Sequence, residues 1–185
     1  MCFMLCVLHC HPDQAEKVME VCRCNIGSDI LRDAFIFTCD RMKRYKGSWH
    51  IEKRELFPDV VFVETGDLGE LSKRISCCED LLSPREDGSL VGRIAPDEES
   101  FLRKLCGSAH HLSMSQGYIR DGKTYVVEGP LAGMERRIRK IDRHKRIAAV
   151  LLCQAEGSPK KQGIAQGINT LGETMMVGLE IVSKS

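Results

Sequence analysis

The spacing of apolar residues changes near residue 107, and this change limits most strongly how the chain can fold. Before it, apolar runs of strand length alternate with stretches of helical spacing. After it, short β-type segments follow one another between glycine-containing turns. With 185 residues the chain is long enough for one domain of ordinary size or two small ones. We therefore expect an α/β N-terminal domain over 1–107, a linker over 108–117 and a small all-β barrel over 118–185.

The N-terminal part predicts strands and helices in alternation. The continuous apolar runs 2–8 and 60–63 predict buried strands, and 34–39 predicts another strand. Helical spacing predicts helices that begin near Asp13, Asp67 and Pro96, the first two with a capping Asp and a Glu three residues later. This order predicts helices packed on a sheet.

The C-terminal part predicts short strands. They fall over 124–127, 138–141, 147–152 and 174–182. Between the last two, residues 155–172 are rich in Gly, Lys and Gln and predict a long flexible loop inserted into a hairpin.

Positive charge is concentrated in two segments, although the net charge of the whole chain is only +1. Residues 41–54 hold six Lys and Arg against one Glu, and residues 136–146 hold seven against one Asp. The first segment predicts a hairpin that turns at 46–48 and interleaves aromatic rings with cations, a combination that binds phosphates and unpaired bases. Its candidate nucleic-acid-binding residues are Arg41, Lys43, Arg44, Tyr45, Lys46 and Trp49.

Two stretches resemble signatures of one known family. Residues 56–64, LFPDVVFVE, resemble the Phe-Pro-Gly-Tyr-Val-Phe-Val signature of the N-terminal (NGN) domain of NusG-type transcription factors. Residues 123–141 resemble the KOW motif, which in that family lies in a C-terminal SH3-like barrel. Residues 41–49, 141–146 and 177–182 are similar to the LoaP group of bacterial antitermination factors. The chain departs from the family pattern at Asp59, Val60 and Arg136, where a Gly, an aromatic residue and a Gly are usual.

The resemblance implies an NGN domain with a mostly antiparallel sheet flanked by helices, which binds the clamp helices of RNA polymerase and disfavours pausing and termination. Its polymerase-binding residues would be Phe3, Phe57 and Val60. The basic hairpin would lie near the non-template DNA. The KOW barrel would bind RNA, in LoaP-like proteins a hairpin in the leader of the target operon, because guanidinium groups stack on bases and pair with phosphates. The residues expected to do so are Arg137, Arg139, Lys140, Arg143, Lys145 and Arg146.

Other functions have weaker support in the sequence. A general NusG-type factor whose KOW domain binds proteins is the first alternative. The second is a metal- or redox-responsive nucleic-acid-binding protein, because the chain has ten cysteines, although no CxxC pair occurs. The motifs GxxxxGK[ST], GxGxxG, HExxH and GxSxG are absent, so we expect no enzyme and no cofactor. The cysteine spacing favours reduced thiols in a cytoplasm, and the apolar N-terminal run is too short for a membrane anchor. We expect the protein to be a monomer.

Overall fold

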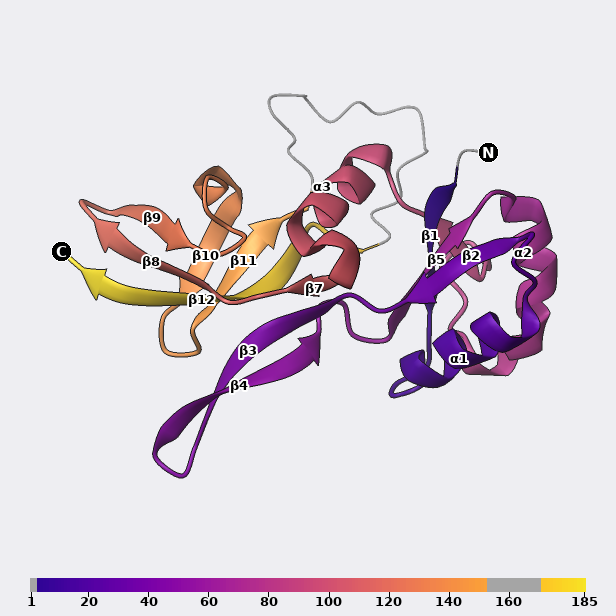
Figure 1. The fold of residues 1–185 in the computed structure, drawn as a ribbon, viewed down its shortest axis with the longest axis horizontal. Coiled ribbons are helices and arrows are strands. Elements are labelled where there is room, and N and C mark those ends of the chain that lie inside the picture. The colour runs from indigo at the N-terminus through magenta and orange to yellow at the C-terminus, as the bar shows by residue number, and fades with distance from the viewer. Residues whose placement is uncertain (1–2, 153–170) are drawn as a thin grey trace. The chain divides into compact units, whose positions relative to one another are not determined.

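The computed structural model describes residues 3–152 and 171–185, which form two compact units (Figure 1). The first unit comprises Met1–Phe37 and Phe57–Glu99, and the second comprises Thr38–Leu56 and Ser100–Ser185. The units therefore do not follow chain order: the hairpin predicted within the N-terminal domain belongs to the second unit. The predicted insertion 155–172 lies outside the described residues except for its last two positions.

The first unit is built on a four-stranded antiparallel sheet with the strand order β2-β5-β1-β6. The strands are β1 (Met4–His9), β2 (Leu31–Phe35), β5 (Val60–Thr65) and β6 (Val91–Arg93). All six residues of β5 are buried, as the unbroken apolar run predicts for a strand covered on both faces. The expected mixed α+β fold with an antiparallel sheet is confirmed.

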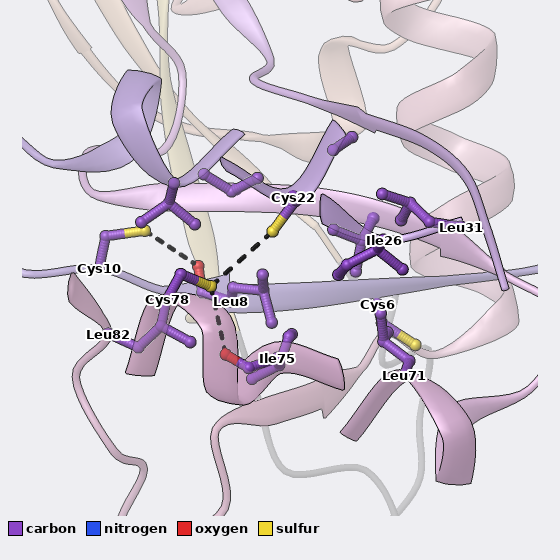
Figure 2. Close-up of a cluster of buried hydrophobic side chains, with 14 of the residues drawn as sticks. Cys6, Leu8, Cys10, Cys22, Ile26, Leu31, Leu71, Ile75, Cys78 and Leu82 are labelled. Carbon is purple, nitrogen blue, oxygen red and sulfur yellow. Dashed lines mark hydrogen bonds between the residues drawn. The ribbon is translucent and has the colours of Figure 1, made fainter. Parts of the chain in front are cut away.

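One face of this sheet packs against helices. These are α1 (Ala15–Asn25), α2 (Leu68–Arg74) and the 3-10 helix η1 (Ile75–Leu81). Figure 2 shows the shared core, which includes Cys6 and Leu8 of β1, Cys22 of α1 and Ile75 of η1. The apolar positions of α1 recur with helical spacing, and this recurrence buries one side of the helix.

The opposite face carries an aromatic cluster. The ring centroid of Phe62 on β5 lies 4.6 Å from that of Phe37, 5.6 Å from that of Phe57 and 6.0 Å from that of Phe35. Phe62 is completely buried. Rings at these distances gain quadrupole contacts in addition to the burial of apolar area, so this cluster is a main source of stability for the first unit.

The predicted N-terminal caps have different outcomes. At α2 the prediction is confirmed, because Asp67 Oδ1 accepts the backbone N–H of Glu70 at 3.0 Å. At α1 it is wrong: Gln14 is the N-cap and makes no side-chain hydrogen bond to the helix. Asp13 instead has a φ of 60° and donates its backbone N–H to Asp59 Oδ1 at 3.0 Å. Asp59 itself has a φ of 58°, which explains why glycine is usual there in the resembled family.

The second unit contains a three-stranded sheet with the order β4-β3-β7. β3 (Thr38–Tyr45) and β4 (Ser48–Glu55) form the predicted basic hairpin, and β7 (His111–Leu112) pairs in parallel with β3. The predicted strand 34–39 is divided, because β2 ends at Phe35 and β3 begins at Thr38. The helix α3 (Pro96–Cys106) begins in the first unit, and its residues from Ser100 on belong to the second, followed by the 3-10 helix η2 (Gly107–Ala109).

A five-stranded sheet completes the second unit, in the order β10-β11-β12-β8-β9. The strands are β8 (Ser115–Arg120), β9 (Lys123–Glu128), β10 (Ile138–Asp142), β11 (Ile147–Leu151) and β12 (Thr174–Lys184), with the 3-10 helix η3 (Glu135–Arg137) before β10. All pairs are antiparallel except β12 with β8. The stretch 108–117, expected as a linker, carries β7 and the first residues of β8. None of the helices in the described ranges is both long and apolar enough to cross a bilayer.

Candidate nucleic-acid interface

The β3–β4 hairpin presents cations and aromatic rings at its tip. Lys46 and Gly47 form the turn with φ values of 50° and 79°, the left-handed backbone that suits a two-residue hairpin connection. Tyr45 is 44% exposed and stacks on His50 with ring centroids 3.8 Å apart. Arg44 is exposed and stands directly opposite Trp49 in the register of the hairpin.

Glu52 on β4 neutralises part of the positive charge of the hairpin. Glu52 accepts from Arg54 at 2.7 Å and lies 3.7 Å from Lys43 Nζ. The hydrogen bond from Arg54 is the main cause that holds the pKa of Glu52 below its ordinary value. Arg44 and Lys46 form no salt bridge with a described carboxylate. No described carboxylate therefore neutralises the charge of Arg44 and Lys46 at the tip.

The β10–β11 connection is the second cationic surface. Asp142 Oδ1 accepts the backbone N–H of Lys145 at 2.9 Å and closes the turn. This hydrogen bond is the main cause that lowers the pKa of Asp142. Four exposed cations on β10 and the turn form no salt bridge with a described carboxylate: Arg139, Lys140, Arg143 and Lys145. We call these four residues the β10–β11 cluster.

Arg137 and Arg146, predicted within the same group, make internal contacts instead. Arg137 Nη1 donates to the carbonyl oxygens of Leu151 and Leu152 at 3.1 and 2.8 Å, and its guanidinium lies 3.9 Å from the ring centroid of Phe101. Arg146 is paired with Glu180 at 2.6 Å. Only a quarter of the Arg146 side chain is exposed (24%). The main role of these two arginines is therefore to stabilise the second unit.

The structure brings the two basic segments together. The guanidinium of Arg146 lies over the ring of Trp49 at 4.2 Å, and Arg41 Nη2 donates to the carbonyl oxygen of Met176 on β12 at 2.7 Å. At Gly178 on β12 an added Cβ would lie 2.6 Å from the carbonyl oxygen of Asp40 on β3, so only glycine permits this approach. The hairpin and the five-stranded sheet thus share one surface within the second unit.

Replacing Arg137 by Gln is expected to lower the free energy of unfolding of the second unit by about 1–3 kcal/mol, because two carbonyl groups lose a charged donor. Trp49 is the only tryptophan of the chain and lies in this unit, so urea unfolding followed by its fluorescence measures the effect. The matched control is Arg139→Gln, an exposed site where the change should stay within about 0.5 kcal/mol. Equal losses in both variants would contradict a structural role for Arg137.

The side chain of Glu135 fixes the segment that leads into β10 by hydrogen bonds to the backbone. Its Oε1 accepts the backbone N–H groups of Val126 at 3.1 Å and Gly133 at 3.4 Å. Partial burial of Glu135 acts to raise its pKa. The hydrogen bonds from the backbone N–H groups of Glu135 itself, Val126 and Gly133 have the larger combined effect, so the pKa of Glu135 lies below 4.5.

The ionised Glu135 is therefore expected to contribute stability above about pH 4.5, and this contribution is lost as the pH falls through the lowered pKa. Glu135→Gln should reduce stability at neutral pH, and the difference from the wild type should shrink on acidification. Urea midpoints by Trp49 fluorescence at pH 7 and pH 3 measure this. Glu128→Gln, at an exposed position on β9, is the control and should show no such convergence.

The three predicted polymerase-binding residues lie in the first unit but differ in exposure. Phe57 and Val60 are 6% and 5% exposed, so both side chains belong to the core. Phe3 is partly exposed, and the guanidinium of Arg32 lies 5.0 Å from its ring centroid. Of the three, only Phe3 offers apolar surface to a partner, and the other two support the sheet from within.

The cysteines do not form a metal centre in the described part of the chain, where no group of three or more potential ligands occurs. Cys22 and Cys78 approach to 3.9 Å between sulfurs in the core of the first unit (Figure 2). Burial raises the pKa of Cys6 to about 11 and that of Cys106 to about 12, so these thiols are protonated at neutral pH.

Of the eight described cysteines, only the exposed Cys24 and Cys77 are expected to react with iodoacetamide in the native protein at neutral pH. The other six are buried and should react only after unfolding, because the attacking species is the thiolate and access is blocked. Mass spectrometry of peptides labelled with and without urea measures this. Rapid native labelling of Cys6 or Cys106 would contradict the assignment of these thiols to the core.

Sequence reasoning missed the partners that come from distant segments. Glu180 on β12 and Phe101 on α3 fix Arg146 and Arg137, yet each is separated from its partner by more than thirty residues. One available signal was the density of the basic segment itself. Seven cations in eleven positions repel one another, so some of them require internal partners.

Comparison with known proteins finds similarity at the level of fold. No family model and no curated protein matches the sequence. A solved structure described as "Domain interaction in Thermotoga maritima NusG" superimposes with a TM-score of 0.56 over 98% of this chain and 95% of that chain, at 15% sequence identity. This likeness covers both units. The chain therefore has a NusG-like fold.

Proposed function

We propose that the chain is a transcription elongation and antitermination factor, similar to LoaP, that binds RNA polymerase through the first unit and nucleic acid through the second. In this proposal the five-stranded sheet is an SH3-like KOW barrel and the ligand of its basic edge is a hairpin in leader RNA. The protein acts by binding, as a cytoplasmic monomer, without catalysis or a cofactor. The NusG-like fold supports the polymerase half of the proposal.

The observation that carries the nucleic-acid half is the β10–β11 cluster. Its four cations are exposed and make no salt bridge with a described carboxylate, whereas Arg137 and Arg146 beside them are held by internal partners. Like charges gathered on one edge destabilise a protein unless an anion compensates them. A phosphate backbone is such an anion, and arginine and lysine in a turn can follow its successive charges.

The hairpin extends this surface toward unpaired bases. Trp49 lies under the guanidinium of Arg146 and opposite Arg44, so two cations flank this half-buried ring. Tyr45 is paired with Ser48, so it lies on the other face of the hairpin and adds a second ring there, 44% exposed. Stacking on aromatic rings tolerates any base, while the cations bind the backbone. The hairpin therefore supports binding of single-stranded nucleic acid, either transcript or non-template DNA.

A salt titration of RNA binding by the full chain tests the nucleic-acid half. Candidate leader hairpins and scrambled controls are compared between low and moderate salt. The proposal expects a steep dependence, about −0.7 per neutralised phosphate on single strands, together with a preference for one hairpin that persists as salt increases. Equal affinity for all RNAs would favour the general NusG-type alternative, and no binding at low salt would overturn the proposal.

A single-round transcription assay tests the polymerase half. With bacterial RNA polymerase on a template that carries the leader and a terminator, added protein should raise read-through. Phe3→Ala should weaken this effect, because Phe3 is the only one of the three predicted contact residues that is partly exposed. Co-sedimentation with polymerase shows whether a variant that loses the effect binds polymerase weakly or binds it in an inactive complex. If the wild-type protein neither changes read-through nor co-sediments with polymerase, the polymerase half of the proposal is refuted and the nucleic-acid half stands.

A further inference from the structure

The solvent face of the β8–β9 hairpin carries a pair of stacked tyrosines that no part of the proposed function uses. Tyr118 and Tyr125 stand directly opposite each other in the register, with ring centroids 5.2 Å apart and ring planes within 18° of parallel. Tyr125 is 42% exposed, and Val127, at the bulge where the register of β8 and β9 shifts, is 62% exposed.

Cations follow the tyrosines on the same face. Arg120 and Lys123 stand opposite each other in the register. Each lies two residues from the tyrosine of its own strand, so this pair is on the tyrosine face. Like charges directly opposite each other destabilise a β-sheet. Arg120 lies 3.9 Å from the carboxylate of the neighbouring Asp121, but both side chains are largely exposed, at 71% and 90%, so this pair neutralises little.

Within the described residues, the neighbouring strands do not cover the tyrosine pair. β9 is the terminal strand of the five-stranded sheet in the described part of the chain. On the other side of β8, the residue paired with Tyr118 is Ser183 of β12, whose small side chain cannot cover the ring. The β10–β11 cluster lies on the strand at the opposite edge of the same sheet. The two surfaces are therefore built on different strands, although Glu135, just before β10, accepts the backbone N–H of Val126 on β9.

We propose that Tyr118, Tyr125, Arg120 and Lys123 form a second RNA-binding site, which takes one or two unpaired bases and the adjoining phosphate of a single-stranded segment. This inference rests on the proposed function, because it concerns the same class of ligand. A base stacks on the exposed tyrosine ring, while Arg120 and Lys123 bind the phosphate. The opposed cations favour RNA over an apolar protein segment, which would leave them unpaired.

The test measures binding of the full chain to oligoadenylate and oligouridylate of about 12 nucleotides, a length that spans several stacking positions. Oligoadenylate should bind more tightly, because a purine offers the larger stacking surface. Tyr125→Ala should weaken oligoadenylate binding about 5- to 100-fold without changing the salt slope. Tyr125→Phe, which keeps the ring, should bind like the wild type. Arg120→Gln with Lys123→Gln should instead reduce the salt slope by about one to two.

Controls separate failure of this site from failure of the proposed function. Val182→Ala, an apolar position 60% exposed on β12, should leave RNA binding unchanged. The urea midpoint by Trp49 fluorescence should be the same in all variants, so that lost binding is not lost folding. If the wild type binds oligoadenylate and Tyr125→Ala binds equally well, the tyrosine site is overturned while the proposed function stands, and a protein partner becomes the better occupant. If the wild type binds no RNA at low salt, the proposed function itself fails.

Discussion

Replacing all four residues of the β10–β11 cluster by glutamine should lower RNA affinity about 10²- to 10³-fold near 0.1 M salt. The reason is counterion release, because each lost phosphate contact removes about 0.7 from the slope of log K against log salt, and four contacts remove about 3. The change should leave stability within about 0.5 kcal/mol, since these side chains are exposed and make no salt bridge with a described carboxylate. Fluorescence anisotropy with a labelled leader hairpin at several salt concentrations measures both quantities.

A matched variant controls for net charge. Four exposed cations on helices outside the proposed surface can be changed to glutamine together: Lys17, Lys73, Arg74 and Lys104. This variant carries the same net charge as the first but keeps the β10–β11 cluster intact. Its RNA affinity should fall only slightly, through the weaker long-range field. If both variants lose affinity equally, binding follows net charge and the assigned surface is wrong.

Phe62→Ala should be the most destabilising single substitution considered for the first unit, with a loss of about 3–5 kcal/mol. Phe62 is fully buried, and its ring lies against those of Phe35, Phe37 and Phe57, so the alanine leaves a cavity among these three rings. A loss of this size approaches the whole stability of many domains. Because the unit contains no tryptophan, hydrogen exchange of the β1 and β5 amides is the suitable measurement.

Phe3→Ala provides the matched comparison for Phe62. The same atoms are removed, but Phe3 is partly exposed and its described ring contact is with the guanidinium of Arg32. The expected loss is about 0.5–1 kcal/mol, the size of a cation–π contact at an exposed site. Similar losses at the two positions would show that the aromatic cluster does not organise the sheet.

Much of the first unit could be predicted because its signals are local. The unbroken apolar run from Val60 identified a strand buried on both faces, and Asp67 with Glu70 identified the start of α2. The same Asp and Glu spacing at Asp13 led to a wrong prediction of the cap of α1, because the backbone N–H of Asp13 bonds to the side chain of Asp59 in a distant loop. A capping box is a local preference, and a tertiary hydrogen bond of similar strength can replace it.

The candidate site could be predicted only in part, because its decisive contacts join distant segments. The sequence located both basic segments and the turn at Lys46-Gly47. It could not separate Arg137 and Arg146 from their neighbours, since Phe101 and Glu180 are brought beside them only by the fold. Nor could it show that the hairpin and the five-stranded sheet belong to one unit, which depends on the close approach at Gly178. The short strand β7 was missed because two residues carry no periodicity.

The central claim is that nucleic acid binds to the surface of the second unit formed by the hairpin tip and the β10–β11 cluster. Ultraviolet cross-linking of the full chain to a leader hairpin, followed by mass spectrometry of the peptides, tests it most directly. We expect adducts in the peptides that contain Tyr45, Trp49 and residues 139–146, and none in the helices α1 and α2. Adducts concentrated in α1 or α2, or their absence from residues 139–146 under conditions where RNA is bound, would contradict the claim.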